Sequence, residues 1–307
     1  DDVQQLVERR LIPLIRQSHP VEGHELNVSC SVGIAVYPED GADLDELMRR
    51  ADAAMYEAKT TGRDMAMFYS VETDQRAQAR QTMEQHLRRA LERDEFHVHY
   101  QPRVSARGGR LQGVEALLRW RHPVLGSVPP MDFIPIAEET GMIRAIGAWV
   151  LEQACLQWVQ WQALPPTDGV PHPLRGVAVS VNLSATQLAD PHLVPDIAAL
   201  LQRTGVPAHR LELEITESQL MDNADAAAQQ LTALKALGLQ LAIDDFGTGY
   251  SSLGYLKRFE IDRLKVDKSF VHDMLTNPAD MAITRAVIAL GHTLGLKIVA
   301  EGVKDLV

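Results

Sequence analysis

Cysteine, long apolar runs and excess positive charge are all scarce in this sequence of 307 residues. The two cysteines, Cys30 and Cys155, lie far apart in the chain, so we expect a reducing compartment rather than a disulfide framework. No run approaches 18 consecutive apolar residues and the first residues do not form a signal peptide, which predicts no membrane contact within this fragment. We therefore expect a cytoplasmic location, with any membrane anchor of the parent protein lying upstream.

The charge balance excludes one broad class of partner. The chain has 30 basic and 41 acidic residues and a formal net charge of −11, which argues against binding a nucleic acid polymer through a basic surface. Any anionic ligand must then be held by local groups. With 46% hydrophobic residues there is enough apolar material for a sizeable core, and the length predicts two compact units or one large barrel.

The chain divides by pattern into an N-terminal segment, a linker and a longer C-terminal segment. Residues 1–70 read as a partial α+β domain, because an alternating strand pattern from Leu26 to Val36 precedes a helical pattern from Leu44 to Thr61. We expect residues 71–85 to form a linker helix. Residues 86–307 form the second domain.

Strand and helix patterns alternate throughout this second domain, which predicts an α/β fold with a parallel sheet, open or closed into a barrel. The expected strands are Phe96–Tyr100, Leu111–Trp120, Val177–Val181, Leu211–Leu213, Gln240–Ile243, Arg263–Val266 and Lys297–Ala300. Because seven strands are counted and not eight, we expect this fragment to lack a closing strand.

Polar residues follow or interrupt most of these strands. They are Glu115, Asn182, Glu214, Asp244, Asp245, Lys265, Asp267 and Glu301. In a parallel barrel such groups project from the same end. Crowded carboxylates repel one another unless a cation compensates them, and an oxygen-only donor set points to magnesium or manganese. The pair Asp244-Asp245 could serve two ions, an arrangement that suits attack on a phosphodiester.

Each of these residues also has a structural interpretation. A lone acid after a strand is commonly a helix N-cap, and the glycines of residues 244–249 are also typical of an ordinary turn. Lys265 could be a solvated lysine, but inside an apolar strand a cation needs a partner. The six acids considered together favour a site.

At these residues the sequence resembles the EAL domain family, whose members cleave cyclic di-GMP. The matching segments, which cover about residue 80 to the end in family order, are Glu115-Ala116-Leu117 with Leu118-Arg119-Trp120, Ser180-Val181-Asn182-Leu183-Ser184, Glu214-Ile215-Thr216-Glu217, Asp244-Asp245-Phe246-Gly247-Thr248-Gly249, Lys265-Val266-Asp267 and Glu301-Gly302-Val303. The first 70 residues resemble the C-terminal part of a GGDEF domain, through Ser31-Val32-Gly33-Ile34-Ala35 and Ala51-Asp52-Ala53-Ala54-Met55-Tyr56. The acid signature of that cyclase family is absent, so we do not expect cyclase activity.

The resemblance implies a TIM-like (β/α) barrel with one reversed strand and a set of residue roles. By similarity, Glu115, Asn182, Glu214 and Asp244 hold a first metal ion, and Asp244 with Asp245 helps to hold a second. Arg119 resembles the residue that grips a ligand phosphate, as a planar guanidinium can. Lys265 would orient water or neutralise phosphate charge, and Glu301 would assist the attacking water. Glu217 resembles an anchor of the glycine loop, and we also assign Asp267 to the site.

The function implied is metal-dependent hydrolysis of cyclic di-GMP to linear pGpG in bacterial signalling, with two Mg²⁺ or Mn²⁺ ions and a homodimer formed through the EAL domain. The family continues beyond the Glu301 motif through a glutamine-bearing loop and a last strand, which this fragment lacks.

Three alternatives stay open. The domain could be a cyclic di-GMP receptor that does not cleave its ligand, although such a receptor would be expected to lose metal ligands. The N-terminal remnant could regulate the barrel. A magnesium-dependent barrel enzyme of the enolase type would account for the acids and a lysine, but not for Arg119 or the glycine loop.

Overall fold

The structure is a computed structural model, and it describes residues 2–21, 24–26, 28–166, 170, 172–222, 224–248, 256 and 258–303. The chain separates into two compact units, residues 1–87 and 88–307. Each unit is described by itself. In the described part of the chain, no helix combines the length and the apolar character needed to cross a membrane.

The first unit contains short strands and two long helices. Its elements are α1 (Asp2–Leu6), a π-helical segment η1 (Val7–Leu11), α2 (Ile12–Ile15), β1 (His19–Val21), β2 (His24–Leu26), β3 (Val32–Ile34), α3 (Leu44–Thr61), β4 (Ala66–Phe68) and α4 (Val71–Ala90). The strand expected from Leu26 to Val36 is shorter in the structure. Only β3 pairs in parallel with β4, and Leu26 belongs to β2. Because β4 offers just three residues, the ladder cannot extend further.

Helix α3 begins and ends where its sequence predicts. Asp43 is the N-cap, and its side chain accepts a hydrogen bond from the Glu46 backbone N–H at 2.8 Å. In return, Glu46 accepts one from the backbone N–H of Ala42, just before the N-cap, at 3.0 Å, so a donor of the first turn and one preceding it are satisfied. Gly62 is the C-cap and donates its N–H to the carbonyl of Ala58, as expected from its place after the last helical residue.

The second unit is built on one sheet. Its strands are β5 (Phe96–Val104), β6 (Leu111–His122), β7 (Gly126–Val128), β8 (Ala178–Asn182), β9 (Leu211–Thr216), β10 (Gln240–Phe246), β11 (Arg263–Val266) and β12 (Lys297–Ala300). The main path runs β12-β11-β10-β9-β8-β6-β5, and short β7 pairs with β6. Along this path all neighbours from β6 to β12 are parallel, whereas β5 and the short β7 are each antiparallel to β6. The expected TIM-like α/β fold with one reversed strand is confirmed.

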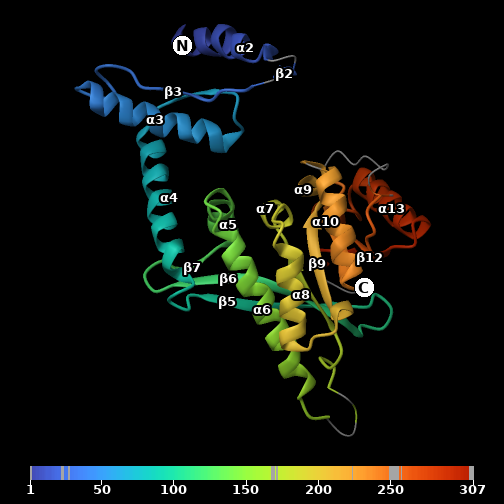
Figure 1. The fold of residues 1–307 in the computed structure, drawn as a ribbon. Coiled ribbons are helices and arrows are strands. Elements are labelled where there is room, and N and C mark those ends of the chain that lie inside the picture. Colours follow the sequence, from blue (N-terminus) through green and yellow to red (C-terminus); the bar gives the residue numbers. More distant parts are fainter. Residues whose placement is uncertain are drawn as a thin grey trace. The chain divides into compact units, whose positions relative to one another are not determined.

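Helices pack on the outer face of this sheet or lie near the ends of its strands (Figure 1). They are α5 (Pro130–Glu139), α6 (Ile143–Gln162), α7 (Ala185–Leu188), α8 (Leu193–Thr204), the 3₁₀ turn η2 (Ala208–Arg210), α9 (Glu217–Asp222), α10 (Ala224–Ala236), α12 (Lys268–His272) and α13 (Pro278–Thr293). Side chains alternate along each strand, so apolar residues such as Val179 and Leu213 point to the helices. The other face turns inward.

The sheet curls strongly enough to bring distant strands together. Lys265 of β11 donates a hydrogen bond to Glu115 of β6 at 3.2 Å, although β10, β9 and β8 lie between these two strands in the sheet. Adjacent strands are about 4.8 Å apart, so a flat sheet would hold these residues much farther from each other. The contact is therefore a direct consequence of barrel-like curvature.

Candidate active site

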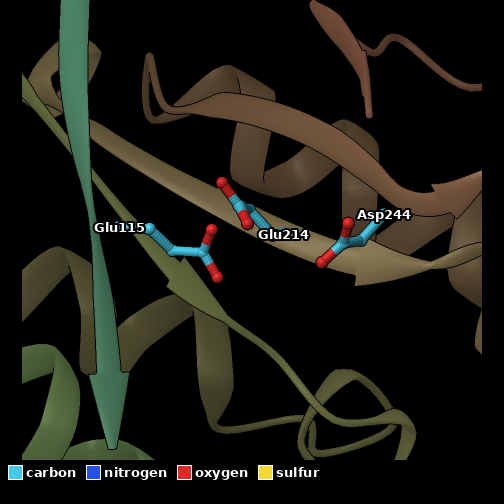
Figure 2. Close-up of side chains that lie close together, drawn as sticks. All are labelled: Glu115, Glu214 and Asp244. Carbon is cyan, nitrogen blue, oxygen red and sulfur yellow. The ribbon is translucent and has the colours of Figure 1, made fainter. Parts of the chain in front are cut away.

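The carboxyl ends of the parallel strands gather acidic side chains on the inner face of the sheet. Glu115 lies in β6, Glu214 in β9 and Asp244 in β10, and Glu301 follows the last residue of β12. Figure 2 shows that the carboxylates of Glu115, Glu214 and Asp244 point toward a common centre. One oxygen from each of these three lies within 4.8 Å of the others, and the same holds for Asp244, Asp245 and Glu301. Asp244 belongs to both groups.

Lys265 is the cation at the centre of these carboxylates. Its Nζ lies 2.5 Å from Glu214, 2.7 Å from Glu301, 3.0 Å from Asp244 and 3.2 Å from Glu115. The lysine side chain is only 1% exposed. The sequence predicted that a lysine inside an apolar strand needs a partner, and the structure supplies four.

Burial raises the pKa values of two acids in this cluster. Burial raises the pKa of Glu214 to about 7, and Lys265 only partly opposes this effect. Burial likewise raises the pKa of Glu301 to about 7. For Lys265, burial favours the neutral amine, but the four carboxylates outweigh it and hold its pKa well above the usual value. Four carboxyl groups therefore surround one ammonium in a poorly hydrated place.

Asp244 and Asp245 lie at an irregularity in strand β10. Ile243 pairs with Leu264 and Phe246 pairs with Val266, so two residues of β10 oppose Lys265 alone. Asp245 has a φ of +51°, a left-handed conformation that aspartate tolerates better than most residues. This bulge turns adjacent carboxylates toward the same end of the sheet. Burial and the charge of Asp244 raise the pKa of Asp245 to about 6.

Asp267 follows β11 and caps helix α12. Its carboxylate accepts hydrogen bonds from the Ser269 backbone N–H, at 2.8 Å, and from the Ser269 hydroxyl. Burial opposes ionisation of Asp267, but these hydrogen bonds and one from the Asp245 side chain outweigh it and lower its pKa. The N-cap interpretation therefore applies to Asp267. Through Asp245, Asp267 also contacts the acidic group formed by Asp244, Asp245 and Glu301.

Glu217 and the segment after Asp245 are joined by one hydrogen bond. Glu217 is the first residue of α9 and is 3% exposed. Its Oε2 accepts from the backbone N–H of Gly247 at 2.9 Å. Gly247 has a φ of +104°, which favours glycine. Gly249, the last residue of the predicted motif, lies outside the described residues.

Asn182 and Arg119 border the cluster. Asn182 is exposed at the end of β8 and donates its amide to Glu115 Oε1 at 2.9 Å. Arg119 lies four residues beyond Glu115 in β6, about 13 Å along the strand and on the same face. Its Nη1 donates to the carbonyl of Leu118 at 2.8 Å. The structure therefore places Arg119 above the acidic cluster rather than in contact with it.

A second polar group below this cluster was missed by the sequence reasoning. Glu212 is completely buried in β9, two residues before Glu214 and on the same face. It accepts hydrogen bonds from Arg103 of β5 at 2.5 Å, Ser180 of β8 at 2.8 Å and Arg263 of β11 at 2.8 Å. Burial opposes its ionisation, but the arginines outweigh this and lower the pKa of Glu212. An acid between Leu211 and Leu213 is the sequence signal that could have revealed it.

The residues present fit divalent cations. Both acidic groups offer oxygen donors alone, which suits hard ions such as Mg²⁺, Mn²⁺ or Ca²⁺. The crowding of four carboxyl groups around one ammonium is a second indication, because buried carboxylates at such separations need a compensating cation. This donor chemistry does not distinguish among those ions.

The family comparison agrees with this geometry. Residues 84–306 match the model of the EAL domain, which is most of the chain. The chain belongs to the EAL domain family. The resemblance inferred from the sequence is thus confirmed. Residues 1–65 match the diguanylate cyclase GGDEF domain, so the N-terminal resemblance is confirmed as well. EAL phosphodiesterase domains generally depend on divalent metal ions, and the acidic cluster is the place where this chain could hold them.

Relatives of this EAL chain include two proteins with named activities. It is 47% identical over 96% of its length to the bifunctional diguanylate cyclase/cyclic di-GMP phosphodiesterase MucR of Pseudomonas aeruginosa, covering 42% of that protein. It is 38% identical over 96% of its length to the cyclic di-GMP phosphodiesterase PdeR of Escherichia coli, covering 43% of that protein. The chain thus spans less than half the length of these curated relatives.

Solved EAL structures share the fold. The MucR phosphodiesterase in a c-di-GMP complex superposes with a TM-score of 0.68 at 47% identity, covering 73% of this chain and 87% of that one. The FimX EAL domain from Pseudomonas aeruginosa bound to c-di-GMP superposes with a TM-score of 0.64 at 27% identity, with the same two coverages.

Proposed function

We propose that this protein is a cyclic di-GMP phosphodiesterase, which hydrolyses one ester bond of the cyclic dinucleotide to give linear pGpG. The observation that carries the proposal is the convergence of Glu115, Glu214, Asp244 and Glu301 on Lys265 at the carboxyl ends of the strands. The names of MucR and PdeR supply the substrate. A carboxylate cluster of this kind suits cleavage of an anionic ester only when cations offset its charge.

Two Mg²⁺ or Mn²⁺ ions are the cofactors that we propose. Glu115, Asn182, Glu214 and Asp244 would hold one ion, and Asp244 and Asp245 would help to hold the other. When bound, such ions supply Lewis-acid chemistry, since they offset phosphate charge and favour the ionisation of water. For Asn182 to contribute its oxygen, the amide that now donates to Glu115 must turn by rotation about χ2.

Lys265 and Glu301 act on the reacting groups in this proposal. Cations among the carboxylates would take over part of the charge that Lys265 now balances, which frees its ammonium to stabilise negative charge on the phosphate or to orient water. Glu301 has a pKa of about 7 because of its burial. A carboxylate with that pKa can accept a proton from water near neutral pH.

Three further residues position the substrate and the site. Arg119, above the acidic cluster, can reach a phosphate with a planar guanidinium that makes two parallel hydrogen bonds. Glu217 holds the backbone of Gly247 and so couples the segment after Asp245 to the site. Asp267, held by the Ser269 backbone N–H, lies beside Asp245 and would help to position that carboxyl group.

The direct test is to incubate the protein with Mg²⁺ or Mn²⁺ and cyclic di-GMP, and to follow pGpG by chromatography. We expect turnover with at least one ion and none in EDTA. Absence of product with both ions would refute the phosphodiesterase proposal.

A matched pair of variants separates cleavage from simple binding. Glu115→Ala is expected to abolish hydrolysis, because it removes an acid from the first group, whereas Glu92→Ala removes an exposed acid of the same domain and should leave turnover intact. A receptor that does not cleave its ligand would instead keep its signalling output when Glu115 is replaced. That result would favour the receptor alternative.

The wider organisation of the protein is also a proposal. We propose a partial GGDEF domain over residues 1–70, a linker helix over 71–85 and the EAL domain over 86–307, in a cytoplasmic protein that dimerises through its EAL domain. Light scattering coupled to size exclusion tests the dimer, and a monomer at micromolar concentration would contradict it. Deleting residues 1–70 tests regulation, which unchanged kinetics and oligomeric state would exclude.

A further inference from the structure

Arg103 connects the polar group around Glu212 to the acidic cluster. Its Nη1 donates to Glu212 Oε1 at 2.5 Å and to Glu214 Oε1 at 3.0 Å. The other oxygen of Glu214, Oε2, lies 2.5 Å from Lys265. Each oxygen of this buried carboxylate is therefore held by a different cation, Arg103 from below and Lys265 at the centre of the cluster.

The position of Arg103 is itself fixed from a distant strand. Arg103 lies in β5, and its side chain passes inside the curled sheet to reach β9, beyond β6 and β8. Its side chain is 11% exposed and that of Glu212 is fully buried. Glu212 is held in turn by Ser180 and Arg263, so the guanidinium docks on an acceptor that cannot easily rotate.

Gly113 provides the room that this path needs. It pairs with Arg103 across the β5–β6 ladder. A Cβ at this position would lie 2.9 Å from Arg103 Nη2 and 3.1 Å from the carbonyl oxygen of Ala178. The second neighbour is backbone and cannot move aside, so the glycine keeps open the passage through which Arg103 crosses.

We propose that Arg103, docked on Glu212, is a positioning residue that fixes the carboxylate of Glu214 for divalent cation binding and thereby for phosphodiester cleavage. This inference rests on the proposed function. In this proposal Arg103 acts through Glu214 and is not itself a ligand. A metal ligand whose second oxygen is held by a hydrogen bond loses less freedom on binding, and such supporting partners commonly change metal affinity by about 10- to 100-fold.

The test compares Arg103→Met with Arg110→Met. Arg110 is exposed beside the same β5–β6 hairpin, so its replacement removes the same charge without touching Glu214. Titration calorimetry with Mn²⁺ alone should show binding weakened by about 10- to 100-fold in Arg103→Met and unchanged in Arg110→Met. With cyclic di-GMP as substrate, kcat of Arg103→Met should fall at subsaturating Mn²⁺ while its KM stays near that of the unsubstituted protein. Excess Mn²⁺ should restore part of kcat.

Arg103→Lys keeps a positive charge on a side chain of similar length, and it is the second variant in case Arg103→Met does not fold. It is expected to bind Mn²⁺ with an affinity between those of the unsubstituted protein and Arg103→Met, because an ammonium does not reproduce the guanidinium geometry. If circular dichroism shows that Arg103→Met does not fold, the Mn²⁺ affinity of Arg103→Lys is used as the test. An affinity within twofold of that of the unsubstituted protein in the folded variant would overturn the positioning role of Arg103 without contradicting phosphodiesterase activity. If the unsubstituted protein binds no Mn²⁺, both the positioning role and the proposed metal-dependent function would be overturned.

Discussion

Lys265 is a buried cation among the acidic side chains of the candidate site. Its ammonium contacts four carboxylates from four separate strands or strand ends, and it is almost completely buried. Burying a lone charge is costly, but a lysine surrounded by acids is strongly favoured to remain charged. The same residue therefore serves stability when cations are absent and, in our proposal, catalysis when they are present.

Replacing Lys265 is consequently expected to have an effect on stability that depends on metal. In EDTA, Lys265→Met should lower the free energy of unfolding by about 3–5 kcal/mol, as when one partner of a buried ion pair is removed. Saturating Mn²⁺ should recover part of this loss, since bound cations compensate the same acids. Urea unfolding under both conditions measures the difference. Lys297→Met, at an exposed position of β12, is the control, and equal losses for Lys265→Met with and without Mn²⁺ would contradict the interpretation.

The two cysteines should differ in reactivity. Burial raises the pKa of Cys155 to about 11, and the residue is 1% exposed. Only the thiolate is nucleophilic, so roughly one thousandth of this thiol is reactive at pH 8, and this fraction rises about tenfold per pH unit up to the pKa. Brief alkylation of the native protein by iodoacetamide should label Cys30, which is partly exposed, in preference to Cys155. Equal labelling in peptide mapping would argue against this.

At the scale of elements, short helices near the strand ends depend on close packing that a sequence does not display. Helix α7 begins directly after the Asn182 region with a capping box, in which Ser184 and Gln187 exchange hydrogen bonds. Gly147 of α6 lies against this box. A Cβ at residue 147 would fall 2.0 Å from Gln187 Nε2.

This contact predicts a change of sign in a double-mutant cycle. Gly147→Ala alone should destabilise the protein by about 1–3 kcal/mol through overpacking. In the Gln187→Ala background the collision is gone, and the same substitution should stabilise the protein by about 1 kcal/mol through helix propensity. Thermal or urea unfolding of the four proteins provides the test. Additive effects would show that the two residues do not compete for space.

The long elements could be predicted because their patterns are strong. Seven strands were expected and all seven occur, with β10 extended to Phe246 and β6 to His122. One missed element is α5, which has 10 residues but begins at Pro130 and contains Pro135, and prolines argue against a helix interior. The other missed elements are short, and among them β7 has three residues, α7 has four and α12 has five. Each gives too few turns or alternations for a period to emerge, and each is stabilised by caps or tertiary contacts instead.

For the candidate site, strand-end acids could be predicted but the supporting group could not. Glu115, Glu214 and Asp244 follow from parallel strands that end together, and the structure brings them within reach of one cation. The contact between Arg103 and Glu212 spans 109 residues and depends on how far the sheet curls. Pattern along the chain carries no information about that curvature, so the pairing was invisible before the structure.

At the scale of the whole molecule, the acidic chemistry belongs to one of two units. Every residue of the two acidic groups lies within residues 88–307, and so do Arg103 and Lys265. The net charge of −11 is therefore compatible with binding an anionic dinucleotide, because cations and arginines can create a locally positive site on an acidic protein. Metal binding should accordingly act on the second unit alone.

Calorimetric unfolding should show this selectivity. We expect two unfolding transitions, and Mn²⁺ should raise the midpoint temperature of only the one that belongs to residues 88–307. At a Mn²⁺ concentration 100 times Kd, the free energy of unfolding of that unit should increase by about 2.7 kcal/mol. A chain that begins at residue 71, and so keeps α4, should retain the Mn²⁺-sensitive transition and lose the other. Glu214→Gln should unfold with both transitions insensitive to Mn²⁺. One transition, or two that Mn²⁺ shifts equally, would mean that the units unfold together, because stabilisation by a ligand spreads only through elements that unfold as one cooperative body.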